Sequence, residues 1–266
     1  TLYHLIFVVK IKNNMKVCVL GSGLSALALA KALVNLNISV NLVDFKKNYK
    51  INKFRTIGIS KSNVNYFNKN IINIEKIIWK LNKIEIYSDN LKNEKILNFE
   101  NSNEYLFSIV KNFEIYEILY KNLSKSKYFK KIKINKQLIK QEEYDLIINT
   151  DYNSVFTKKF FSKKIEKAYD SSAYTTIINH EKILNNVAIQ IFTKKGPLAF
   201  LPISNHQTSI VYSMHNFKNY SSENINELIH KYNLKYKIKK IEKIISFDLK
   251  SYFLRSFYHD KILAFG

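Results

Sequence analysis

Residues 15–44 constrain the fold of this chain most, because they contain the complete order of a βαβ unit. Residues 17–20 are an apolar run long enough for a strand buried on both faces, and the sequence GSGLSA follows at once. A helical apolar pattern then runs to Leu36, and a second apolar run, residues 39–43, ends at Asp44. The sequence therefore predicts a strand, a tight glycine turn, a helix and a second, parallel strand.

The glycine turn, residues 21–26, is similar to the G-x-G-x-x-G/A pattern of dinucleotide-binding proteins. Gly21 permits the tight turn, Gly23 lets the backbone approach a diphosphate at the helix N-terminus, and Ala26 allows close packing of helix and strand. Asp44 follows at about the 20-residue spacing of the acid that accepts hydrogen bonds from an adenosine ribose, which favours FAD or NAD over NADP. The predicted cofactor-binding residues of this unit are Gly21, Ser22, Gly23, Leu24, Ser25, Ala26 and Asp44.

A βαβ unit whose glycines only form a tight turn is the alternative interpretation of this segment. A single glycine-rich string is weak evidence, because such turns are common. Here the strand, the glycine turn, the helix, the second strand and the terminal acid follow one another in the required order. This order favours the dinucleotide interpretation.

The formal net charge of the 266-residue chain is +22, which raises nucleic acid or an anionic membrane as partners. The excess is almost all lysine, spread among Asn and Ile, without the interleaved Arg and aromatic residues that base recognition needs. We therefore predict no nucleic-acid binding, while attraction to an anionic membrane surface stays open. The apolar part of residues 1–14 is too short for a membrane helix, so we interpret this segment as a leader or an upstream extension.

Cysteine and histidine give no sign of a metal site. Cys18 is the one cysteine and lies in the first predicted strand, so we expect it to be buried in a chain of the reducing cytoplasm. His180, His206 and His215 lack metal-ligand spacing, and we interpret them as surface or turn residues. The sequence identifies no catalytic acid, base or nucleophile.

The rest of the chain predicts a second sheet of a different kind. Residues 144–151 form an apolar strand that ends in a polar turn, as a further parallel strand of the first sheet would. The segments 83–89 and 95–99 predict an antiparallel hairpin. Further strands with short connections are expected over residues 174–179, 186–193, 198–202 and 208–214, and more strands near residues 241–247 and 261–265. The fold class is therefore α/β, a Rossmann-like domain with a second, mainly antiparallel β-sheet domain.

With these segments in place, the sequence resembles the flavin-dependent aromatic hydroxylases of the p-hydroxybenzoate hydroxylase fold. Within that family it is most similar to the UbiH/UbiF-like enzymes, which hydroxylate the ring of ubiquinone precursors. Besides the glycine turn and Asp44, where most relatives have Glu, RTIGIS at residues 55–60 resembles the family's R-x-x-A-L-S segment. GPLAFLP at residues 196–202 is close to the G-P-L-A-L-L-P strand of the ubiquinone branch, and KILAFG at residues 261–266 matches the strand that leads into the G-D motif.

The resemblance implies an FAD-dependent monooxygenase that uses NAD(P)H and O₂ to hydroxylate the aromatic ring of a polyprenylated phenol. It places Arg55 against the flavin, and it adds Asp151 of the D-G motif and Gly266 of the G-D motif to the cofactor-binding residues. It also places Leu198, Phe200 and Pro202 in the substrate pocket, although such an apolar stripe is also typical of plain core. A cytoplasmic protein at the inner face of the membrane, with other ubiquinone-biosynthesis proteins as partners, is the expected setting.

The same resemblance implies the domain boundaries. The FAD-binding domain is expected over residues 15–81, 104–158 and 260–266, and the substrate domain over residues 82–103 and 159–259. Because the chain stops at the glycine of the G-D motif, we expect it to be truncated at its C-terminus.

The chain departs from the family at the D-G motif, where Tyr152 replaces the glycine and the segment is one residue short. A tyrosine does not adopt positive φ cheaply, so this turn must be rebuilt, and nicotinamide docking stays open. Tyr152 supports the alternative of a decayed or non-catalytic paralogue that acts as a binding or scaffold subunit. An NAD-dependent dehydrogenase is a further alternative, against which the antiparallel sheet after Asp151 argues.

Overall fold

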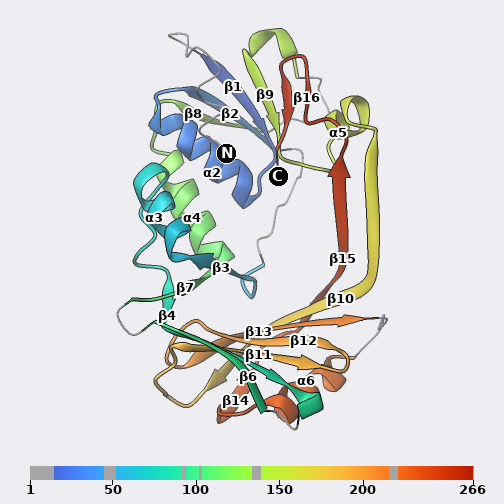
Figure 1. Cartoon of the computed structure of the whole chain (residues 1–266). Helices are drawn as coiled ribbons and strands as arrows, with labels where there is room; N and C mark the ends of the chain where they lie inside the picture. Colours follow the sequence, from blue (N-terminus) through green and yellow to red (C-terminus); the bar gives the residue numbers. More distant parts are fainter. Residues whose placement is uncertain are drawn as a thin grey trace.

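The computed structural model describes residues 15–44, 52–91, 94–101, 104–133, 139–215 and 221–265. Three β-sheets organise these residues: a first sheet of six strands, a second sheet of eight, and a small sheet of three. Figure 1 shows the first sheet at the top, the second at the bottom and the small sheet between them. The predicted leader and Gly266 lie outside the described residues. In the described part of the chain, no helix is both long and apolar enough to span a membrane.

The first sheet has the strand order β16-β17-β9-β1-β2-β8. Its strands are β1 (Lys16–Leu20), β2 (Ser39–Asp44), β8 (Phe129–Lys133), β9 (Leu146–Asn149), β16 (Tyr258–His259) and β17 (Ile262–Ala264). All neighbours are parallel except β16 and β17. Helix α2 (Leu24–Asn35) connects β1 to β2, which confirms the predicted order of strand, turn, helix and parallel strand.

Strand β1 is apolar throughout because both of its faces are covered. Val17 and Val19 pack in the core under α2 and α4 (Asn112–Leu123), whereas Cys18 and Leu20 face a second core. That second core includes Phe161, at the end of α5 (Val155–Phe160). Cys18 is fully buried, as predicted, and burial raises the pKa of its thiol to about 12.

The second sheet has the order β14-β10-β13-β12-β11-β5-β6, with β15 paired to β10. Its strands are β5 (Lys83–Ser88), β6 (Glu94–Glu100), β10 (Lys164–His180), β11 (Val187–Thr193), β12 (Gly196–Pro202), β13 (Gln207–His215), β14 (Ile238–Ile241) and β15 (Ile245–Leu254). Neighbours are antiparallel except β5 and β11, and β5 and β6 form the predicted hairpin. Helix α6 (Ser222–Tyr232) covers the face that points away from the first sheet (Figure 1).

The small sheet joins the two larger ones. It consists of β3 (Thr56–Ser60), β7 (Phe107–Lys111) and β4 (Trp79–Leu81), with α3 (Lys61–Asn70) following β3. The Thr56 and Ser209 hydroxyls are 2.9 Å apart, and the Lys111 ammonium donates to the Gln207 side chain at 3.2 Å. The remaining short elements are the 3₁₀ helices η1 (Asp89–Leu91) and η2 (Gln141–Glu143). The domain boundaries stay a prediction.

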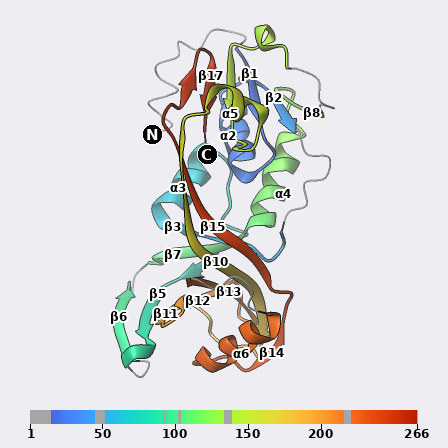
Figure 2. The ribbon, with the colours of Figure 1, turned by 90° about the vertical axis from the view of Figure 1, so that its right-hand side faces the viewer.

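The longest strands, β10 and β15, leave the second sheet as a two-stranded ribbon that rises to the first sheet and ends near α5 (Figures 1 and 2). The sequence predicted strands here only over residues 174–179 and near residues 241–247, and the second of these includes only residues 245–247 of β15. Residues 164–170 of β10 are exposed, so they lack the apolar alternation that would have revealed them. The register of the ribbon shifts between Ala168 and Ser172, where Asp170 has a φ of 46°.

The interpretation of His180 as a surface or turn residue is wrong. This residue ends β10 and is only 3% exposed. Its Nδ1 donates to the Glu181 carbonyl at 2.7 Å, and its Nε2 accepts from the Thr208 hydroxyl at 3.1 Å. A polar side chain is tolerated here because both ring nitrogens have partners.

Candidate functional site

Gly21 makes the turn between β1 and α2 in a conformation that favours glycine. Its φ is 121°, and its N–H donates to the Val43 carbonyl at 2.9 Å. A Cβ at this position would overlap the hydroxyl of Thr150, which itself donates to the Leu20 carbonyl at 2.8 Å. Gly21 is therefore required by the fold, because it lets the ends of β1 and β9 approach one another.

Gly23 is different, because no atom of the described residues lies where its side chain would be. It is the N-cap of α2 with a φ of −78°, and a Cβ there would meet nothing within 4 Å. Within the part of the chain that the structure describes, no side chain caps α2, and the first turn of this helix contains no acidic residue. By contrast, serines cap α3, α5 and α6, and α4, which also lacks a side-chain cap, has Glu114 in its first turn. The uncapped N–H groups and the positive end of the helix dipole suit an anion such as a diphosphate.

The other residues of the glycine turn surround this open position. Ser22 is 5% exposed and Ala26 is fully buried, so both belong to the packing of the turn. Leu24 packs at the edge of the core under α2, and Ser25 is exposed. Ala26 thus has the predicted packing role, whereas contact with a cofactor stays a prediction for all of these residues.

Asp44 is the last residue of β2 and is only 8% exposed. The Nζ of Lys131, on the neighbouring strand β8, lies 3.8 Å from Asp44 Oδ2. The carboxyl ends of β1 and β2 are adjacent in the sheet, so Asp44 lies at the same edge as the N-terminus of α2. A helix N-terminus and a carboxylate at one edge of the sheet suit the diphosphate and the ribose of an ADP group.

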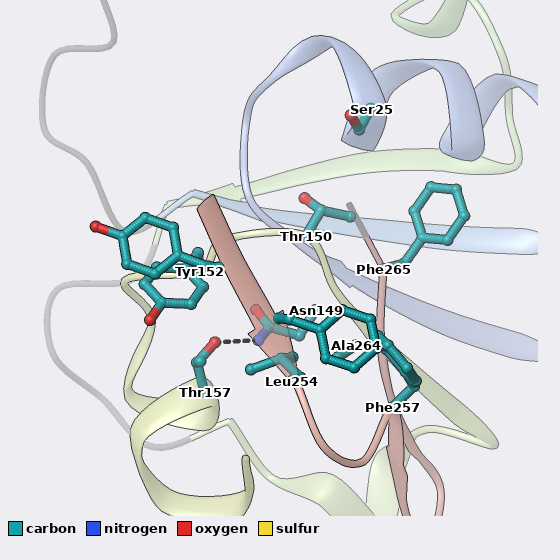
Figure 3. A pocket seen from close by; sticks show the side chains of 11 residues that line it. Ser25, Asn149, Thr150, Tyr152, Thr157, Leu254, Phe257, Ala264 and Phe265 are labelled. Carbon is teal, nitrogen blue, oxygen red and sulfur yellow. Dashed lines mark hydrogen bonds between the residues drawn. The ribbon is translucent and has the colours of Figure 1, made fainter. Parts of the chain in front are cut away.

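A cavity of about 340 Å³ lies at the carboxyl ends of β9 and β17 (Figure 3). One part of its lining is polar and the other is largely aromatic. The lining residues are Ser25, Asn149, Thr150, Tyr152, Thr157, Tyr252, Phe253, Leu254, Phe257, Ala264 and Phe265. Because Ser25 belongs to the first turn of α2, the cavity adjoins the open N-terminus of this helix and extends toward β15.

The turn after β9 is rebuilt without a glycine, as predicted. Asn149 holds it: its Nδ2 donates to Thr157 Oγ1 at 2.7 Å (Figure 3), and its Oδ1 accepts from the Ser154 hydroxyl at 3.0 Å. Asp151 belongs to this turn, and its Oδ1 accepts from the Asn153 N–H at 3.0 Å. Tyr152 avoids positive φ, and its ring lies against that of Tyr252 with centroids 4.1 Å apart.

Arg55 lies at the junction between the small sheet and the second sheet. Its side chain is exposed, and its guanidinium is 5.5 Å from the centroid of the Phe247 ring on β15. The structure thus places Arg55 on the side of the first sheet that faces the second, and its contact with a flavin stays a prediction.

The assignment of Leu198, Phe200 and Pro202 to a substrate pocket is wrong. Leu198 and Phe200 are 0% and 1% exposed and pack in the core with α6, and Pro202 is buried on the same face of β12. Successive side chains of a strand point to opposite faces. Ala199 and Leu201 therefore lie on the face toward the small sheet, where Leu201 packs against its core.

Sequence reasoning missed Thr150, Tyr252 and Lys131. Thr150 was inside a predicted polar turn, but nothing in the sequence showed that it would meet Gly21. Tyr252 lies in the unpredicted half of the ribbon. Lys131 is one of many lysines, and only the pairing of β8 with β2 brings it beside Asp44.

The fold is that of FAD-dependent monooxygenases, as comparison with solved structures shows. The p-nitrophenol 4-monooxygenase PnpA from Pseudomonas putida matches with a TM-score of 0.74 at 9% identity, over 96% of this chain and 72% of that one. PqsL from Pseudomonas aeruginosa, described as a probable FAD-dependent monooxygenase, matches with a TM-score of 0.72 at 11% identity, over 96% and 78% of the two chains. For 2,6-dihydroxypyridine-3-hydroxylase from Arthrobacter nicotinovorans the TM-score is 0.71 at 12% identity, over 96% and 77%.

No family model matches the sequence, and no curated protein does. At identities this low, the structural likeness establishes the fold alone.

Proposed function

We propose that this chain binds FAD, with the diphosphate at the N-terminus of α2 and the adenosine ribose at Asp44. The observation that carries the proposal is the open, uncapped helix end at Gly23 beside a buried carboxylate, in the fold of FAD-dependent monooxygenases. An uncapped helix end and a buried carboxylate both reduce the stability of a folded chain unless something compensates them. A nucleotide diphosphate would compensate the helix end, and ribose hydroxyls would donate to the Asp44 carboxylate, whose charge already faces the Lys131 ammonium.

We further propose that the protein is an NAD(P)H-dependent and O₂-dependent monooxygenase that hydroxylates an aromatic ring. The names of the neighbours support an aromatic substrate, since two of them are named for p-nitrophenol and 2,6-dihydroxypyridine. The segment GPLAFLP supports the ubiquinone branch, and with it a polyprenylated phenol as substrate. Action at the inner face of the membrane, next to other ubiquinone-biosynthesis proteins, belongs to the same proposal.

The protein's part in this chemistry is binding and orientation. When bound, the flavin supplies the oxygen chemistry, and the chain excludes water and holds the ring in place. Arg55 and Phe247, which contact one another and are both exposed to solvent, would border the space between the first and second sheets. The face of β12 that carries Ala199, instead of the one with Phe200, would contact the substrate.

Tyr152 favours a second candidate function, a non-catalytic paralogue that keeps FAD or its fold as a binding subunit. Its ring and that of Tyr252 occupy one wall of the cavity. If this stack excludes a reductant, the chain would bind FAD without turnover.

The test is FAD titration of the full-length protein, followed by NADH and NADPH oxidation with and without a prenylated phenol. We expect saturable FAD binding that Asp44→Ala weakens, oxidation stimulated by the phenol, and a product that has gained one oxygen atom by mass spectrometry. FAD binding without oxidation would favour the non-catalytic candidate. A full-length protein that does not bind FAD would refute the proposed cofactor site and the monooxygenase, and would leave only the candidate that keeps the fold without the cofactor.

A further inference from the structure

The Asp44–Lys131 pair is the most buried ion pair within the described residues. The Asp44 side chain is 8% exposed and the Lys131 side chain 23%. In every other ion pair of the described residues, the acid and the lysine are both more exposed than these. Most lysines of this chain are on the surface, as their number requires, so a half-buried lysine beside a buried carboxylate is unusual for it.

The fold fixes the position of the Lys131 ammonium. Lys131 is paired with Leu42 in the parallel register of β8 and β2, so both side chains lie on the face that α2 and α4 cover. The Lys131 Nζ lies 5.1 Å from the centroid of the Tyr120 ring on α4. The ammonium is thus held between α4 and the Asp44 carboxylate, at the edge of the sheet where the ribose is proposed to bind.

The distance between the two groups matters as much as their burial. At 3.8 Å the pair is an electrostatic contact and is too long for a hydrogen bond. Lys131 therefore compensates the carboxylate's charge without itself occupying one of its acceptor positions. Removing a lysine from such a pair leaves a buried charge without that compensation, which disfavours the buried orientation of the carboxylate.

We propose that Lys131 is a positioning residue, which holds the Asp44 carboxylate in the orientation that accepts hydrogen bonds from the ribose hydroxyls. This inference rests on the proposed function and names a residue that acts through Asp44 without contacting the ribose. Its consequence is selective, because losing Lys131 should weaken recognition of the ribose hydroxyls and leave the diphosphate site at α2 intact.

The experiment measures the preference of the full-length protein for ADP over 2′,3′-dideoxy-ADP, by competition against bound FAD. A hydrogen bond to a charged group corresponds to roughly a tenfold to hundredfold preference for ADP in the wild type. Lys131→Met should reduce this preference to about twofold or less, and Lys131→Arg should retain most of it.

Lys130→Met is the matched control, since Lys130 is the exposed neighbour on β8 and the substitution removes the same charge. It should keep the wild-type preference. Equal weakening of both nucleotides by Lys131→Met would mean a structural role and overturn the proposal, and so would loss of the preference in Lys130→Met. A wild type without any preference would instead refute Asp44 as the ribose ligand, and with it the proposed function.

Discussion

Substituting the two glycines of the turn should separate the requirements of the fold from those of the ligand. Gly21→Ala places a side chain at a φ of 121°, which costs about 1–3 kcal/mol in backbone strain. The new Cβ also overlaps the Thr150 hydroxyl, which must move and lose its hydrogen bond to the Leu20 carbonyl, at a cost of about 1 kcal/mol. The free energy of unfolding should therefore fall by about 2–4 kcal/mol, a large part of the 5–15 kcal/mol typical of a folded protein.

A double-mutant cycle with Thr150→Ala tests this division of the cost. Without the hydroxyl, Gly21→Ala retains the strain of the backbone but loses the overlap, so its cost should fall by about 1 kcal/mol. The assay is urea denaturation followed by circular dichroism, with the unfolding free energy extrapolated to water.

Gly23→Ala is the matched control, because its φ of −78° suits alanine and the added Cβ meets open space. Alanine restricts the unfolded chain but is a poorer N-cap than glycine, so stability should change by less than about 1 kcal/mol. FAD affinity should nevertheless fall by about tenfold, since the methyl group stands where the diphosphate is proposed to approach. If Gly21→Ala and Gly23→Ala were equally stable, Gly21 would not be required for folding. If Gly23→Ala bound FAD as the wild type does, Gly23 would not be required for binding the diphosphate.

Three further predictions concern the core and the polar networks. Phe200→Ala should lower the unfolding free energy by about 3–5 kcal/mol and Ala199→Ser by less than about 1 kcal/mol in urea titrations, and equal effects would contradict the assignment of the two faces of β12. Burial lowers the pKa of His180 from its usual 6.5, so its contribution to stability is present above about pH 6.5 and is lost as the pH falls through the lowered pKa. Wild-type stability should therefore decline on acidification more than that of His180→Gln, whereas parallel pH profiles would argue against a buried neutral imidazole that accepts from Thr208. Asn149→Ala removes the side chain that holds the turn after β9 and should cost about 2–4 kcal/mol, and an unchanged thermal midpoint would show that other groups hold that turn.

The sequence predicted the βαβ unit well because each of its signals is local. A strand buried on both faces must be apolar at every position, and residues 17–20 satisfy this alone. The positive φ of Gly21 follows from the same tight turn. Local sequence alone therefore predicts that the six residues of the turn and Asp44 lie at one edge of the sheet.

The face of β12 could not be predicted with the same success. Alternation divides residues 196–202 into two sets, and both contain apolar side chains. Which set is core depends on α6, a distant segment whose helix is clear in the sequence but whose position is not. Leu198 and Phe200 were assigned to the substrate pocket because they are large and apolar. The same property makes them fill the core.

The pattern of helix caps and ion pairs bears on whether the site is a functional one. Serines cap α3, α5 and α6, and α4, which also lacks a side-chain cap, has Glu114 in its first turn, so of these helices α2 alone has neither a cap nor a first-turn acid. The least exposed carboxylate of any ion pair within the described residues lies at the same edge of the sheet. A chain that used this fold only as a scaffold would gain stability by capping α2 and by replacing both Asp44 and Lys131 with well-packed apolar residues. An open helix end beside this buried ion pair is therefore expected where a diphosphate binds the helix end and ribose hydroxyls donate to Asp44, which favours cofactor binding over the decayed alternative and leaves the role of Tyr152 to be decided by turnover.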